Sequence, residues 1–135
     1  MKALREKYGV VGMVGAVQTI IPRNVYALDE AVISVTQIHT GTASNIVPET
    51  AMFQATIRAF DPQVRALLKR RFHEIVEGHA LAYNVKADVH YDWGYPATVN
   101  HPDETRFAAE VAAEVAGEDA VQADANREMG SEDFS

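Results

Sequence analysis

The stretch Ala51–Tyr83 reads AMFQATIRAFDPQVRALLKRRFHEIVEGHALAY, and its hydrophobic period changes in the middle. Up to position 60, apolar and polar residues alternate, as in a half-buried β-strand. Asp61 and Pro62 then form a helix start, because a carboxylate caps free N–H groups and proline suits the first helical turn. Apolar residues follow at helical spacing, and Asn84 can end the helix in a left-handed conformation. The stretch therefore predicts a strand followed directly by a helix over 62–83.

Further elements are predicted on both sides of this stretch. They are a helix over 3–21 ended by Pro22, a strand over 31–38, a strand over 85–91 with one wet face, and a helix over 102–116. In the last helix the apolar residues Phe107, Val111 and Val115 are expected to face inward. This order indicates an α+β fold: a two-layer sandwich in which helices cover one face of an antiparallel sheet.

The element order matches a ferredoxin-like β-α-β-β-α-β unit that lacks its first strand. That strand is normally central, between the third and the fourth strands, so its absence leaves unpaired backbone groups on both neighbours. Each such group costs about 1–3 kcal/mol if it is buried dry. We therefore expect either residues 119–125 to fill the position or two chains to pair their strands.

Composition restricts the classes of function. The 135 residues carry a net charge of −7, and an acidic surface repels phosphate backbones, so a nucleic-acid partner is not expected. No apolar run approaches the roughly 18 residues that a membrane span needs. Glu6 interrupts the N-terminal apolar pattern and argues against a signal peptide. The sequence has no cysteine, which excludes disulfides and thiolate zinc sites and fits a cytoplasmic protein.

The histidines do not form a metal motif. His73 and Glu77 stand four apart on the predicted helix, and His90 and Asp92 share a strand face, but neither pair has a third ligand. We interpret all of them as exposed polar residues. The serines lack a nucleophile elbow, and no glycine-rich phosphate loop is present. The residue types alone therefore show no self-sufficient catalytic set.

Asn45 and Arg58 are the pair that suggests ligand chemistry. Asn45 lies in the polar loop before the strand 51–60, and Arg58 lies near the far end of that strand, opposite its apolar face. A guanidinium and an amide together suit a carboxylate, since the guanidinium donates two parallel charge-assisted bonds and the amide adds a neutral donor. A turn-capping asparagine and a surface arginine explain the same residues without a ligand, and both interpretations stay open on the residues alone.

Four motifs resemble a known family of metal-dependent amidohydrolases, which includes aminoacylases, hippurate hydrolases and indole-acetyl-amino-acid hydrolases and is related to carboxypeptidase G. The motifs occur in the family's order and spacing: AVQTIIPRNVYALDEAVISVTQIHTGTASNIVPET (16–50), ATIRAFDPQVR (55–65), WGYPATVNHPDET (93–105) and MGSEDFS (129–135). The resemblance covers nearly the whole chain from about Val14 onward.

This resemblance implies a division of roles along the chain. Residues 1–92 correspond to an incomplete lid and dimerisation domain, and residues 93–135 to the returning segment of a catalytic domain. In the family the lid makes a homodimer through a strand edge and a helix. Its asparagine and arginine, thirteen apart like Asn45 and Arg58 here, hold the carboxylate of an N-acyl amino acid, commonly in the partner subunit's active site. Gly130, Ser131, Glu132 and Asp133 correspond to a loop near the active site and are carried over only as substrate-binding pocket walls.

The sequence also departs from the family pattern, and these departures bear on its function. The family binds two divalent metals, usually zinc or manganese, through residues that this sequence does not contain. We therefore expect this chain to be a fragment that binds no metal cofactor and is inactive by itself, because amide hydrolysis then has no activated water and no base. The alternative is a non-catalytic module that self-associates or binds a small acid.

Overall fold

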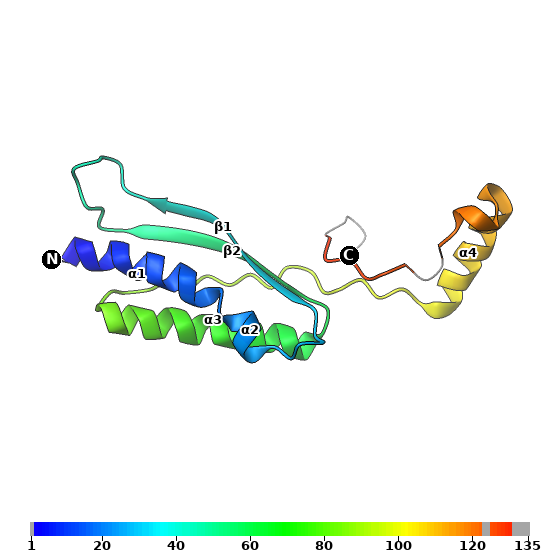
Figure 1. Ribbon diagram of the computed structural model, residues 1–135, viewed down its shortest axis with the longest axis horizontal. Coiled ribbons are helices and arrows are strands. Elements are labelled where there is room, and N and C mark those ends of the chain that lie inside the picture. The colour runs from blue at the N-terminus through cyan, green and yellow to red at the C-terminus, as the bar shows by residue number, and fades with distance from the viewer. Residues whose placement is uncertain (1, 123–124, 131–135) are drawn as a thin grey trace. The chain divides into compact units, whose positions relative to one another are not determined.

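The structure of the chain is a computed structural model that describes residues 2–122 and 125–130 (Figure 1). The chain divides into two compact units, residues 1–94 and residues 95–135. The first unit contains helices α1, α2 and α3 and strands β1 and β2, and the second contains α4 and the short 3₁₀ turn η1. The helices together with the two strands make this an α+β fold, as the sequence predicts.

The predicted helix 3–21 is two helices, α1 (Lys2–Val17) and α2 (Ile20–Asn24). The prediction that Pro22 ends the helix is wrong, because Pro22 lies inside α2. Proline is tolerated there since the N–H groups of a first helical turn have no intrahelical partner. Gly12 of α1 serves packing: a Cβ there would lie 3.4 Å from the Tyr83 hydroxyl, so the glycine lets α1 approach α3 closely.

Strands β1 (Ala31–Thr40) and β2 (Ala51–Ala59) form an antiparallel hairpin. The register pairs Ala31 with Ala59 at one end and Thr40 with Ala51 at the other, with a shift at Thr36. The extra residue makes a β-bulge, and its hydroxyl lies 3.4 Å from the Gln54 carbonyl oxygen that it faces. Strand β2 lies where the alternating pattern predicts it, and β1 begins at the predicted residue 31 but runs two residues further than predicted, to Thr40.

Helix α3 (Pro62–Tyr83) has the predicted bounds and the predicted caps. The Asp61 carboxylate accepts hydrogen bonds from the N–H groups of Gln63 at 2.6 Å and Val64 at 3.1 Å. At the other end Asn84 is left-handed, with φ 52°. The Val85 N–H then bonds back to the Ala80 carbonyl at 2.9 Å, which turns the chain sharply out of the helix.

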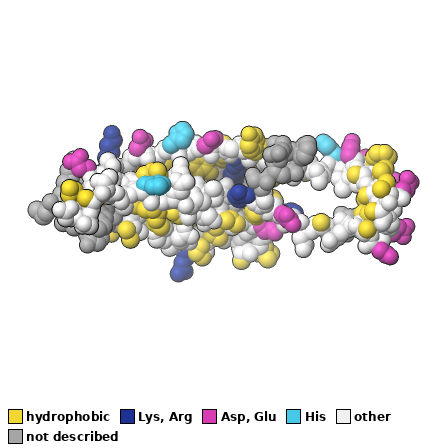
Figure 2. All heavy atoms as spheres, turned by 90° about the horizontal axis from the view of Figure 1, so that it is seen from above, with side chains coloured by type: hydrophobic (Ala, Val, Ile, Leu, Met, Phe, Trp, Pro, Cys, Tyr) yellow, Lys and Arg dark blue, Asp and Glu magenta, His cyan; other side chains and the backbone are white. Residues whose placement is uncertain are grey.

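The core of the first unit lies between the hairpin and the helices. Figure 1 shows α1 and α3 on the same side of the two strands. The buried side chains come from α1, α2, β1 and α3 and are Met13, Val17, Ile20, Ile33, Val64, Leu68, Val76 and Ala80. Phe53 and Ile57 of β2 pack against this cluster with partial burial. The sheet face away from the helices keeps some apolar residues exposed, and Figure 2 shows hydrophobic side chains scattered among charged ones.

The prediction of a strand over 85–91 is wrong: within the described residues the sheet has two strands, and this segment carries no assigned element. Its side chains nevertheless alternate as predicted, with Val85, Ala87 and Val89 packed partly against the core and the intervening residues exposed. The segment is extended, but a strand requires a neighbour to bond with, and none pairs with it. The strand expected to lie beside it is the missing first strand of the ferredoxin-like unit, and this explains why the segment forms no strand.

The second unit contains α4 (Pro102–Ala116), with the predicted bounds, and η1 (Glu118–Ala120). The expectation that its apolar residues face inward is wrong: Phe107 is 68 % exposed, Val111 41 % and Val115 83 %. The described part of this unit offers no layer to bury them.

Candidate functional site

Asn45 lies in the loop 41–50 that joins the two strands. The loop begins at Gly41, whose φ of 77° is a left-handed conformation that glycine adopts without strain. Asn45 is exposed, and the apolar residues that follow it, Ile46 and Val47, are exposed as well. The loop therefore presents an amide beside an uncovered apolar pair at one end of the hairpin.

Arg58 lies at the other end of β2, where it pairs with Val32 of β1. The residues that share its face of the strand, Met52, Gln54 and Thr56, are all exposed, whereas Arg58 is half-buried. Arg58 is therefore less exposed than its neighbours on that face. This placement agrees with an arginine on the polar face of the strand, as the alternation predicts.

Within one chain the structure does not bring Asn45 and Arg58 together. Arg58 stands seven residues beyond Ala51, the first residue after the loop, and seven extended residues span about 23 Å. Figure 1 shows the loop at one end of the hairpin and the turn into α3 at the other. One carboxylate is only a few ångströms across, so the two residues of a single chain do not hold the same carboxylate in this arrangement.

The remaining predicted site residues lie near the C-terminus. Gly130 is exposed and outside any helix or strand. Ser131, Glu132 and Asp133 lie outside the described residues.

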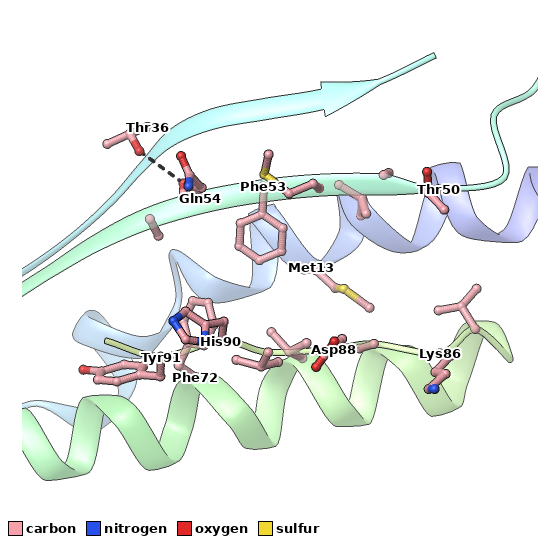
Figure 3. A pocket seen from close by; sticks show the side chains of 18 of the residues that line it. Met13, Thr36, Thr50, Phe53, Gln54, Phe72, Lys86, Asp88, His90 and Tyr91 are labelled. Carbon is pink, nitrogen blue, oxygen red and sulfur yellow. Dashed lines mark hydrogen bonds between the residues drawn. The ribbon is translucent and has the colours of Figure 1, made fainter. Parts of the chain in front are cut away.

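A groove of about 910 Å³ runs along β2 on the side away from β1 (Figure 3). One wall is formed by residues 49–57 and the other by residues 84–93, while Val10, Met13, Phe72 and Val76 contribute from α1 and α3. Figure 3 shows Phe53 and Met13 pointing into the space between the walls. Sequence reasoning anticipated an unpaired strand position but not that it would be a lined groove.

Aromatic rings and cations fasten the outer wall of the groove to α3. The Lys69 ammonium lies 5.1 Å from the Tyr91 ring centroid and 4.5 Å from that of Trp93, and the Arg65 guanidinium lies 5.0 Å from Trp93. Burial raises the pKa of the Tyr91 hydroxyl, and the charge of Arg65 partly opposes this effect. No local sequence pattern predicts these contacts, because they join residues more than twenty positions apart.

The two histidines of α3 each hydrogen-bond to a backbone carbonyl group of the same helix. The Nδ1 atoms of His73 and His79 lie 2.9 Å from the Lys69 carbonyl oxygen and 3.0 Å from the Ile75 carbonyl oxygen. A carbonyl only accepts, so each ring donates from Nδ1. Among the described residues, no three His, Cys, Asp or Glu side chains are grouped closely enough to hold a metal ion. The described donor set therefore does not fit a divalent metal centre.

The geometry of the first unit defines a small α+β domain whose hairpin is backed by helices on one face. The comparisons identify it further: residues 1–84 match the peptidase dimerisation domain of the M20 family. This chain belongs to that family, the M20 amidohydrolases.

Named relatives agree with this assignment. The chain is 37 % identical over 121 residues to an uncharacterised hydrolase of Sinorhizobium fredii, covering 90 % of the chain and 30 % of the relative. It is 32 % identical over 133 residues to the hippurate hydrolase of Campylobacter jejuni, covering 98 % and 35 %. It is 36 % identical over 122 residues to the N-acetyldiaminopimelate deacetylase of Priestia megaterium, covering 90 % and 32 %. The chain thus spans about a third of the length of the curated relatives it matches. In the described part of the chain, no helix is long and apolar enough to cross a membrane.

Proposed function

We propose that residues 1–92 form the lid and dimerisation domain of an amidohydrolase that cleaves N-acyl amino acids, and that residues 93–135 belong to its catalytic domain. The observation that carries the proposal is the hairpin, which places Asn45 and Arg58 at opposite ends beside a strand edge suited to pairing. The names of two relatives, a hippurate hydrolase and an N-acetyldiaminopimelate deacetylase, support the substrate class. A cytoplasmic location remains part of the proposal.

The dimer would form through the outer edge of β1. Within the described residues β1 pairs only with β2, so its other edge is available to a second copy. Two identical strands related by a two-fold axis pair antiparallel and continue the sheet from one subunit into the next. The end of β1 at Thr40 would then lie beside the Ala31 end of the partner strand.

This pairing supplies the carboxylate site that one chain lacks. Asn45 follows the Thr40 end of one subunit, and Arg58 pairs with Val32 near the Ala31 end of the other. Because Arg58 is one strand in from the edge, the partner's β1 would lie only about 10 Å away, two strand spacings. We infer a site composed of Asn45 from one subunit and Arg58 from its partner, with Gly130, Ser131, Glu132 and Asp133 as further pocket walls.

The metal of the family, zinc or manganese, has no fitting ligand set among the described residues, and we derive no metal-dependent step from them. The isolated chain is expected to hydrolyse N-acyl amino acids no faster than buffer when either metal is added. Hydrolysis well above the buffer control would overturn the assignment of this chain as a lid that depends on a catalytic part elsewhere.

Complementation between two inactive variants tests the composite site. Asn45→Ala and Arg58→Ala should each abolish the NMR shifts that hippurate, used as the probe acid, induces in the wild-type chain. Mixing and re-annealing the two variants should restore binding at about a quarter of the sites, because half of the dimers are mixed and each has one intact site. Arg106→Ala, which alters an exposed arginine of the other unit, is the matched control and should bind like wild type.

Two other results would contradict this arrangement. If both variants bind hippurate normally, the chain has no carboxylate site at these residues. If mixing restores nothing while each variant still forms dimers, the two residues do not act across a subunit boundary. Self-association without any acid binding would favour the alternative of a non-catalytic assembly module.

The strand edge is tested separately by a charge. Ile38 of β1 is 51 % exposed, and Ile38→Lys places an ammonium at the proposed interface, as natural edge strands do to prevent pairing. The dimer dissociation constant, measured by sedimentation equilibrium, should rise about tenfold or more. Leu81→Lys, on α3 and 84 % exposed, should leave it unchanged; equal effects of both substitutions would exclude β1 as the interface.

A further inference from the structure

The bulge in β1 decides which face of the sheet the end of that strand presents. Val32 and His39 are seven residues apart, so on an unbroken strand they would lie on opposite faces. The bulge at Thr36 adds one residue and shifts the alternation, with the result that Val32 pairs with Arg58 and His39 pairs with Met52. Arg58 and Met52 share a face of β2, because they are six residues apart, and directly opposed residues share a face as well. His39 therefore lies on the same face of the sheet as Arg58.

His39 is exposed, and a neighbour on its own strand orients its ring. The Nε2 atom of His39 lies 3.2 Å from the Oε1 atom of Gln37. An amide oxygen only accepts hydrogen bonds, so the ring donates from Nε2. Both ring nitrogens donate when histidine is protonated, which makes Nδ1 the atom that can meet an anion.

The proposed dimer brings His39 into line with Arg58 of the partner subunit. Where Thr40 lies opposite the partner's Ala31, His39 lies opposite the partner's Val32. Val32 in turn pairs with Arg58 in its own chain. His39 and the partner's Arg58 thus stand at the two ends of a row across three neighbouring strands, about 10 Å apart and on one face.

A carboxylate between these residues would have a hydrogen-bond donor for each of its acceptor positions. Its two oxygens offer about four lone-pair positions, and a guanidinium fork occupies two of them. Asn45 of the loop supplies one further donor, and a protonated His39 supplies another.

We propose that His39 is a third carboxylate-binding residue of the composite site, contributed by the subunit that contributes Asn45. The inference rests on the function proposed above and deepens it, since it adds a cationic donor to the same site. Gln37 acts as a positioning residue that orients the ring.

Titration with hippurate, followed by NMR shifts, tests the contact. His39→Ala should weaken binding about tenfold, because one charge-assisted hydrogen bond is lost. His39→Lys keeps a cationic donor at the same exposed position and should recover most of the affinity. His101→Ala removes an exposed histidine of the second unit and is the matched control, which should bind like wild type. The same loss in the lysine variant as in the alanine variant would overturn the role of His39 as a donor.

Mixing variants shows which subunit contributes His39. At concentrations where all variants are dimeric, re-annealed His39→Ala and Arg58→Ala should restore wild-type affinity at about a quarter of the sites, because half of the dimers are mixed and each has one intact site. His39→Ala mixed with Asn45→Ala should restore none, since both residues come from the same subunit and every site lacks one of them. Restored binding in this second mixture would overturn the arrangement.

The composite site and the role of His39 fail in different ways. If the wild-type chain does not bind hippurate, or if Asn45→Ala and Arg58→Ala do not complement each other, the composite site is wrong and the role of His39 is overturned with it. If those two variants complement each other while His39→Ala binds like wild type, the composite site stands and only the role of His39 is overturned.

Discussion

Individual residues in this chain act chiefly through caps and buried side chains. Asp61 ends the strand pattern and begins α3 by accepting two backbone hydrogen bonds. Asn84 ends the same helix in a left-handed turn that directs the chain back along it. Leu68 is completely buried between these two ends. The cap residues set the limits of α3, and the buried residues attach it to the rest of the unit.

Asp61→Ala should lower the free energy of unfolding by about 1 kcal/mol, because the N–H groups of Gln63 and Val64 lose their acceptor. Urea denaturation followed by circular dichroism measures the change. Asp61→Asn keeps a side-chain oxygen at the same position and should cost only a few tenths of a kcal/mol. An equally large loss in the asparagine variant would show that the charge, not the cap hydrogen bond, is responsible.

Leu68→Ala should cost about 2–5 kcal/mol, because it opens a cavity in a fully buried site. Leu81→Ala makes the same chemical change on the same helix, but Leu81 is 84 % exposed. We expect that control to stay within about 0.5 kcal/mol of wild type. Similar losses in both variants, measured by chemical denaturation, would be incompatible with the core described here.

At the scale of elements, the segment 84–93 depends on side-chain contacts where a strand would depend on backbone pairing. Its alternate apolar residues pack partly against the core, and its end is held by Lys69 and Arg65 over the rings of Tyr91 and Trp93. Exposed cation–π contacts of this kind contribute about 0.5–1 kcal/mol each. The segment is therefore expected to open more readily than the hairpin does.

Lys69→Gln should loosen this segment selectively, since it removes the cation that lies over both rings. The rate of chymotryptic cleavage after Tyr91 and Trp93 should rise about three- to tenfold, while cleavage after Phe53 of β2 stays unchanged. Lys86→Gln, which removes an exposed lysine of the segment itself, provides the comparison. Uniform acceleration over the whole unit would mean that Lys69 stabilises the fold globally.

The raised pKa of Tyr91 makes the stability of the folded chain depend on pH in the alkaline range. Because burial raises the pKa of its hydroxyl in the folded state, the folded chain binds that proton more tightly than the unfolded chain does. The resulting stabilisation is complete below the unfolded pKa of about 10 and is lost as the pH rises through the folded value. Tyr91→Phe should therefore lose less stability than wild type as the pH rises above about 10. Parallel pH profiles of the two proteins, measured by denaturation, would contradict this assignment.

At the scale of the whole molecule, the two units of the chain differ in how far their apolar side chains are buried. The first has a buried cluster of side chains from β1 and from the three helices α1, α2 and α3. In the second, α4 carries no buried residue among those described. A helix with an exposed apolar stripe normally packs against a further layer. In the proposed function that layer is the remainder of the catalytic domain.

Replacing Phe107 and Val115 with serine should therefore change the free energy of unfolding of this chain by less than about 0.5 kcal/mol, because both are exposed. Solubility of the chain should rise as the apolar stripe disappears. Denaturation curves and the saturation concentration measure the two effects. A loss of several kcal/mol would show that α4 is buried in solution, against the exposure described here.

Local signals along the chain were enough to predict two of its elements. The Asp61 and Asn84 caps and the helical stripe gave α3 its bounds, and the strict alternation over residues 51–59 placed β2, because these signals come from the residues themselves and their near neighbours. The motifs also identified the family. Other features depend on contacts between distant parts of the chain. Residues 85–91 have a strand's alternation without a partner, Phe107 has a core residue's spacing without a layer above it, and Asn45 lies a full strand's length from Arg58. Pairing, burial and convergence depend on groups far away in the chain or outside it, and no local pattern carries that information.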